Sequence, residues 1–107
     1  MAQSSEAQLL AERYAQALFS LAQEEKKLDQ VSKELSQLDS CINGSDALQA
    51  TLKSPIVSRV EMVGVVMALA QKLDLGDISK NLLVLCARNR RLLALQSIIA
   101  EFMNILA

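Results

Sequence analysis

Residues 5–24 read SEAQLLAERYAQALFSLAQE, and this stretch decides the fold class. Ser5 followed by Gln8 is the Ser-x-x-Gln form of a helix capping box, which predicts a helix from here to about Glu24. The apolar residues form two neighbouring stripes, Leu10, Tyr14, Ala17, Leu18 and Leu21 on one side and Ala11, Ala15, Phe19 and Ala22 on the other. The apolar arc of this helix is therefore wider than one core-facing side needs.

The rest of the chain repeats helical spacing between helix breakers. Apolar steps of three and four residues predict a second helix from Leu28 to Ile42, ending before Asn43-Gly44. Ser45 is predicted to cap a short helix over 46–53, which ends at a turn at Ser54-Pro55. The Ser58–Glu61 capping box begins a helix that runs to Leu73. Asp77 is predicted to cap a helix that runs to Asn89, and a last helix covers 92–106. The sequence thus predicts six helices, one of them short.

The polar segment 23–27 is the one ambiguous junction. It contains no Gly or Pro, and the apolar phase of Leu21 continues into Leu28, so a single long helix is locally possible. A small domain must turn its chain back to bury both stripes of the first helix, which favours a break here. We therefore predict that residues 1–107 form one all-α domain, a compact six-helix bundle.

Composition agrees with this fold class and excludes several functions. Leu and Ala supply 33 of the 107 residues, against three Gly and one Pro. The chain has no His, which excludes hydrolytic triads and His-containing metal sites, and Glu24-Glu25 point apart on a helix. The scattered glycines form no phosphate-binding loop. Neither an enzymatic activity nor a cofactor is predicted.

Charge, cysteine and hydropathy patterns limit the possible partners. The chain has a net charge of −1, whereas nucleic-acid-binding proteins typically carry an excess of basic residues. Cys41 and Cys86 lie in apolar surroundings, which favours reduced, buried thiols. The longest stretch without a strongly polar residue, 62–70, is far below the roughly 20 residues of a membrane-spanning helix. No targeting segment precedes the first helix, so we expect no direct membrane insertion.

Two features remain as candidate interaction sites. Residues 81–87, NLLVLCA, are apolar on nearly every side of their helix, and the first helix has a wide apolar arc. Either both helices lie centrally in the bundle, or they leave an apolar groove for a partner helix, and the pattern does not decide between these. The cations Arg88, Arg90 and Arg91 could bind phosphate, or could simply stabilise a helix C-terminus.

Three motifs, in order, resemble one family. RYAQALF at 13–19, LKSPI at 52–56, and NLLVL at 81–85 followed by NRRL at 89–92 resemble the corresponding motifs of the ATP synthase delta subunit, known in mitochondria as the oligomycin-sensitivity-conferring protein. The resemblance spans essentially the whole chain. Family members are longer, so the chain resembles their N-terminal domain without the smaller C-terminal domain.

The resemblance implies a non-catalytic stator subunit that links the catalytic head of the ATP synthase to the peripheral stalk. In similar proteins an amphipathic N-terminal helix of an alpha subunit lies across the first and fifth helices. Carried over by motif, the contact residues would be Tyr14, Ala17, Leu18, Leu21, Ile78, Asn81, Leu82 and Leu85. For each of these residues ordinary core packing is the competing interpretation.

The same resemblance implies where the protein works. Contact with the b subunits of the stalk would belong to the absent C-terminal domain. The location would be peripheral, on the cytoplasmic face of the bacterial inner membrane, or alternatively on the matrix side in mitochondria. Two other functions remain open: a helical adaptor for a different amphipathic helix, and a small nucleic-acid-binding regulator that uses Arg88, Arg90 and Arg91.

Overall fold

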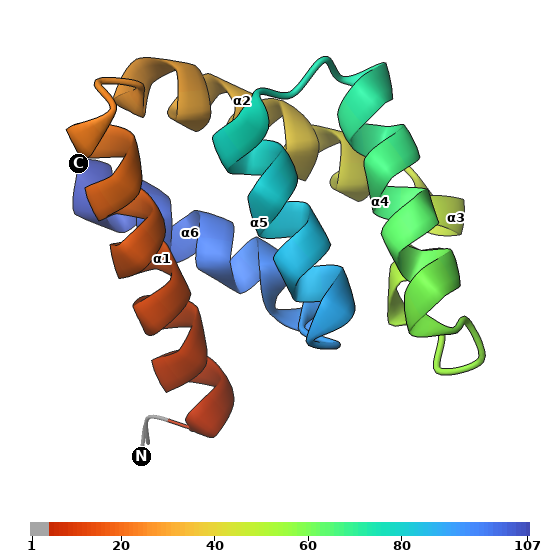
Figure 1. Cartoon of the computed structure of the whole chain (residues 1–107). Helices are drawn as coiled ribbons and strands as arrows, with labels where there is room; N and C mark the ends of the chain where they lie inside the picture. Colours follow the sequence, from red (N-terminus) through yellow and green to blue (C-terminus); the bar gives the residue numbers. More distant parts are fainter. Residues whose placement is uncertain (1–4) are drawn as a thin grey trace.

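The computed structural model describes residues 5–107, which form six α-helices and one 3-10 turn. The elements are α1 (Glu6–Glu24), α2 (Leu28–Asn43), α3 (Asp46–Lys53), α4 (Arg59–Lys72), α5 (Asp77–Arg88), η1 (Leu92–Ala94) and α6 (Leu95–Leu106). No strand occurs among these residues, so the predicted all-α bundle with one short helix is confirmed. Figure 1 shows α4 and α5 side by side, with α1 crossing α6 at the other side of the bundle.

Three helices begin at the predicted serine caps. The hydroxyls of Ser45 and Ser58 accept the backbone N–H groups of Leu48 and Glu61, and the Ser58–Glu61 capping box is complete. At α1 only half of the predicted box forms. Ser5 Oγ accepts the N–H of Gln8 at 3.1 Å, but the Gln8 side chain donates to Glu12 and Glu101 instead of reaching back to the cap.

The predicted cap at Asp77 is wrong. Gly76 occupies the N-cap position of α5 and has no side chain that could cap the helix. Asp77 is already the first helical residue. The carboxylate of Glu34 on α2 accepts the Gly76 N–H instead, at 2.9 Å. A tertiary contact has therefore replaced the local cap that the sequence suggested.

The predicted break between the first two helices is confirmed, and its geometry explains why no glycine is needed. Lys26 takes a left-handed backbone conformation with φ of 58°, and the N–H of Lys27 bonds to the carbonyl of Ala22 at 2.8 Å. This is a Schellman ending, in which the left-handed position is usually glycine. Helices α4 and α5 end in the same way at Asp74 and Arg90, each with φ of 54°.

Two other helix ends differ slightly from prediction. Helix α2 includes Asn43, with Gly44 at its C-cap in a non-left-handed conformation. The last helix is preceded by the 3-10 turn η1, and its α-helical part begins at Leu95 instead of Leu92. Both shifts leave the apolar phase of the helices unchanged.

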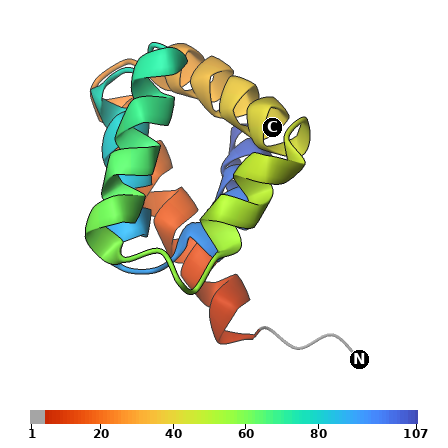
Figure 2. The same ribbon diagram turned by 90° about the vertical axis from the view of Figure 1, so that its right-hand side faces the viewer.

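The core is built from aliphatic side chains around one phenylalanine. Phe102 of α6 is fully buried and packs against Phe19 of α1, with ring centroids 5.7 Å apart. The largest fully buried aliphatic side chains come from four helices: Leu35 and Leu38, Val66, Leu83, and Leu95 and Ile98. Figure 2 shows the helices arranged around this interior. Within residues 5–107 no helix combines the length and apolar character required to cross a bilayer.

Packing separates the two apolar stripes of α1. Ala11, Ala15 and Ala22 are fully buried, and α1 packs mainly on α6. Their small side chains let the two helices approach closely. Of the other stripe only Leu18 is buried, while Tyr14 is half-buried and Ala17 and Leu21 are exposed. The second stripe therefore faces outward from the α1–α6 contact.

Candidate functional site

A groove of about 360 Å³ lies between α1 and α5. All eight predicted contact residues line it, four from each helix: Tyr14, Ala17, Leu18, Leu21, Ile78, Asn81, Leu82 and Leu85. Arg13, which the sequence analysis did not single out, is the ninth lining residue. The structure thus brings the predicted set together around one cavity, and of the two explanations for the apolar excess it favours the groove.

The groove has a buried floor and exposed apolar walls. Leu18, Ile78 and Leu82 form the floor and are 5–7% exposed. Leu21 on one wall and Leu85 on the other are 41% and 47% exposed, respectively. Exposed leucines on both walls of a groove are typical of a surface that receives the apolar side of another helix.

Polar groups lie at the margins of the groove. The Tyr14 hydroxyl accepts a hydrogen bond from the Asn89 side chain at 3.2 Å, which ties α1 to the C-terminal end of α5. Arg13 and Asn81 are exposed and available for hydrogen bonds to a bound segment. The site therefore combines an apolar trough with a few polar groups that could fix the orientation of a ligand.

Glu34 positions the N-terminal end of α5, and so one wall of the groove. Besides the Gly76 N–H, its carboxylate accepts the Ser79 hydroxyl at 2.7 Å, and Ser79 is the one polar residue that is fully buried among those described. Glu34 was not among the residues that the sequence analysis singled out. No local signal could reveal its role, because the partners lie 42 and 45 residues away along the chain.

The remaining candidates form no chemical site. Arg88, Arg90 and Arg91 are exposed, and only Arg90 and Arg91 share a cavity, beside the start of α1. In residues 5–107 no group of three His, Cys, Asp or Glu could hold a metal ion. Both thiols in this part of the chain are free, but only Cys86 is buried, where the loss of solvent raises its pKa to about 12. Cys41 is half-buried, which corrects the prediction of two buried thiols.

Comparison with known proteins identifies the family. Residues 10–107 match the family model described as ATP synthase delta (OSCP) subunit. The ATP synthase subunit delta of Brucella anthropi is 39% identical over 98 residues, which cover 92% of this chain and 53% of that protein. The subunit delta of Rhizobium rhizogenes is 40% identical over 98 residues, with 92% and 52% covered, and that of Methylobacterium radiotolerans is 38% identical over 93 residues, with 87% and 49% covered.

The chain therefore spans about half the length of the curated relatives it matches. The motifs that suggested the resemblance, at 13–19, 52–56 and 81–92, all lie inside the region matched by the family model. Because that region is most of the sequence, the chain belongs to the ATP synthase delta (OSCP) subunit family.

Proposed function

We propose that this domain is a connector in the stator of an ATP synthase and that its α1–α5 groove holds the amphipathic N-terminal helix of an alpha subunit. The family is that of a structural, non-catalytic subunit, so the function is mechanical. The observation that supports the proposal best is the groove itself, since its lining contains all eight residues that the motifs indicated.

The exposed walls supply the driving force for such an interaction. Completing the burial of a leucine that is still 41–47% exposed contributes about 0.7–1.4 kcal/mol. Leu21 and Leu85 alone would contribute about 1.4–2.8 kcal/mol, before any contact with the floor. A stator has to resist torque, so it needs slow dissociation, and a helix buried between two preformed walls meets this requirement.

Coverage of half of each relative leads to a second part of the proposal. The chain spans about half of each relative, and we assign it to the N-terminal half of a delta subunit, which leaves contact with the b subunits of the peripheral stalk to the other half. As part of that assembly the domain would lie at the membrane periphery, on the cytoplasmic face of the bacterial inner membrane or, alternatively, on the matrix side of the mitochondrial inner membrane. Each of these locations follows from the position of the catalytic head, not from a membrane contact by this domain.

The groove is tested by NMR titration of the isotopically labelled domain with a peptide of about 20 residues from the N-terminus of an alpha subunit. We expect saturable shifts confined to α1 and α5. Ala17→Asp should keep the fold and weaken binding by about 2 kcal/mol or more, roughly thirtyfold, because the peptide would desolvate an unpaired charge. Ala100→Asp is the matched control, since Ala100 is also exposed but lies on α6 outside the groove.

The same titration distinguishes the competing functions. Unchanged affinity of Ala17→Asp for the peptide would show that the peptide does not bind in the groove. Equal affinity for an unrelated amphipathic peptide would favour a general helical adaptor. Binding of oligonucleotides with a steep salt dependence would favour the regulator that uses Arg88, Arg90 and Arg91.

A further inference from the structure

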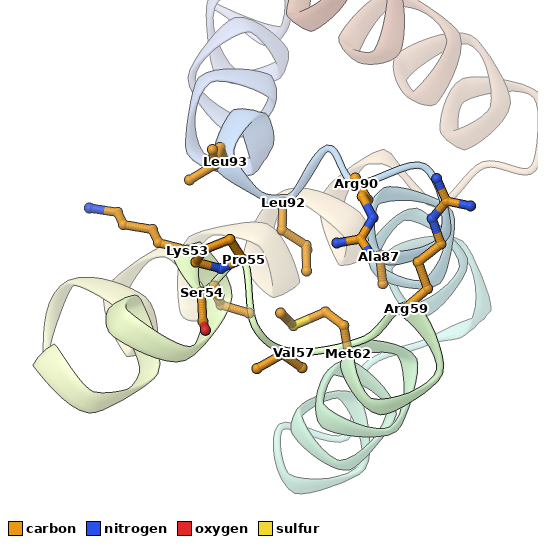
Figure 3. Close-up of a pocket in the computed structure, with 11 residues that line it drawn as sticks. Lys53, Ser54, Pro55, Val57, Arg59, Met62, Ala87, Arg90, Leu92 and Leu93 are labelled. Carbon is orange, nitrogen blue, oxygen red and sulfur yellow. The ribbon is translucent and has the colours of Figure 1, made fainter.

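A second cavity, of about 200 Å³, lies where the turn after α3 meets the end of α5 and the start of η1. It shares no lining residue with the α1–α5 groove. In Figure 3 the side chains of Met62 from α4 and Leu92 from η1 extend into it from opposite sides, and Val57 of the turn before α4 also lines it. For comparison, an apolar cavity of about 150 Å³ holds a benzene ring, so this one has room for an apolar side chain.

The surface around this cavity is unusually apolar. Its floor is made of Leu52, Met62 and Leu92, each 6–8% exposed. Leu93 on its edge is 72% exposed, and Ile56 and Val60, next in sequence to lining residues, are 90% and 84% exposed. These are the three most exposed large hydrophobic residues of the described chain. One of the three lines the hollow and the other two are bonded in sequence to residues that line it, and exposed large hydrophobic residues beside a hollow are typical of an interaction surface.

The charges lining the cavity are all positive. Lys53, Arg59 and Arg90 line it, and no acidic residue does. Among residues 5–107 the one ion pair joins Lys80 to Asp77, so these three cations have no carboxylate within 4.0 Å. Figure 3 shows Arg59 and Arg90 on one side of the opening, while the Lys53 ammonium group extends away on the other side.

The nearest acidic residue in the sequence forms no ion pair with these cations. Glu61 lies two residues after Arg59, but its carboxylate accepts the Ser58 backbone N–H at 2.9 Å in the capping box. The chain as a whole has a net charge of −1, so the unpaired cations are a local concentration of positive charge on a nearly neutral domain.

We propose that this surface docks an acidic amphipathic helix of a protein partner. One apolar side chain of the helix enters the cavity, its neighbours cover Ile56, Val60 and Leu93, and its carboxylates pair with Arg59 and Arg90. Guanidinium groups suit this role because they bind carboxylates in a bidentate geometry. The inference does not depend on the α1–α5 groove, because the two surfaces are separate.

The lining favours a protein segment over other anionic ligands. Single-stranded nucleic acid binds through aromatic platforms for its bases, and no aromatic residue lines this cavity. Anionic membranes are recognised by clusters of four to eight cations, whereas only Arg59 and Arg90 of the lining cations lie together at this opening. An apolar pocket beside a few cations matches instead a helix that carries both leucines and carboxylates.

The test uses a synthetic helical peptide of about 18 residues built from Leu, Ala and Glu, titrated into the labelled domain. A second peptide with Gln in place of every Glu is the ligand control. The double variant Arg59→Gln/Arg90→Gln removes the paired charges, and Lys33→Gln/Lys72→Gln removes the same net charge from exposed residues outside the cavity. Amide spectra of each variant establish that the fold is retained.

We expect saturable shifts at residues 52–62 and 87–93 with the acidic peptide. The arginine double variant should weaken binding about fivefold to tenfold, the value for two exposed ion pairs, and the lysine double variant should bind as the parent does. Absence of shifts in these segments, shifts in the α1–α5 groove alone, or equal binding of the Gln peptide would overturn the proposal. Tighter binding of an oligonucleotide or of phosphatidylserine vesicles at the same residues would also overturn it.

Discussion

Replacing Glu34 with alanine should destabilise the domain although the residue lies on a polar helix side. Its carboxylate accepts the Gly76 N–H at 2.9 Å and the Ser79 hydroxyl at 2.7 Å, and thereby joins α2 to the first turn of α5. Ser79 is fully buried in the folded domain, so removing the carboxylate leaves its hydroxyl without this partner and with only partial access to water. Glu34→Ala therefore removes both a helix cap and the partner of a buried donor.

The size of the effect follows from these two contacts. A buried hydroxyl left without a partner costs about 1–3 kcal/mol, and loss of an N-terminal cap costs about 0.5–2 kcal/mol. Since Glu34 itself is half-buried and water can reach part of the site, the sum is reduced at its upper end, and we expect about 1.5–4 kcal/mol in total. Domains of this kind have a free energy of unfolding of about 5–15 kcal/mol, so the loss is a large fraction of it.

Urea denaturation followed by circular dichroism measures this loss as a lower transition midpoint with an unchanged slope. Ser79→Ala removes the buried donor, so Glu34→Ala should cost less in that background, with a coupling of about 1 kcal/mol or more in the double-mutant cycle. Glu34→Gln keeps one acceptor oxygen and should lose about half as much as Glu34→Ala. A loss below about 0.5 kcal/mol for Glu34→Ala, or additive effects of the two substitutions, would refute the tertiary cap.

Three further predictions concern other parts of the chain. Lys26→Gly should raise the free energy of unfolding by up to about 1 kcal/mol in thermal or urea denaturation. Lys26 has a left-handed backbone conformation with φ of 58°, which glycine adopts without a steric cost. A loss of stability would contradict the Schellman ending. Thiol titration at pH 8 should label Cys41 and leave Cys86 unreacted until the protein unfolds, because burial raises the pKa of Cys86 to about 12. Rapid labelling of both thiols in the native state would contradict the burial of Cys86. The hydrogen bonds from Ser58 lower the pKa of Glu61 in the folded state. The ionised carboxylate therefore stabilises the folded domain above the unfolded-state pKa, and this stabilisation is lost as the pH falls through the folded-state pKa. Glu61→Gln should lack this pH-dependent part of the stability in acid unfolding, and identical pH profiles of the variant and the parent would refute the prediction.

The sequence by itself determined the number of helices, most of their ends and the family. Caps and helical spacing act over three or four residues, so Ser45, Ser58 and the apolar steps carry their information locally. Even the residues that line the groove could be predicted from the motifs. The left-handed ending at Lys26 could not, because no glycine marks it.

Only the tertiary structure decided which stripe of α1 is buried and what holds α5 in place. Both stripes are apolar, one rich in leucine and the other in alanine, and the choice between them depends on the packing of α1 against α6, which begins 71 residues after the end of α1. The cap of α5 is supplied by Glu34 across 42 residues, where the sequence suggested Asp77. Long-range packing sets these features because it depends on the relative positions of whole helices, which no local sequence pattern specifies.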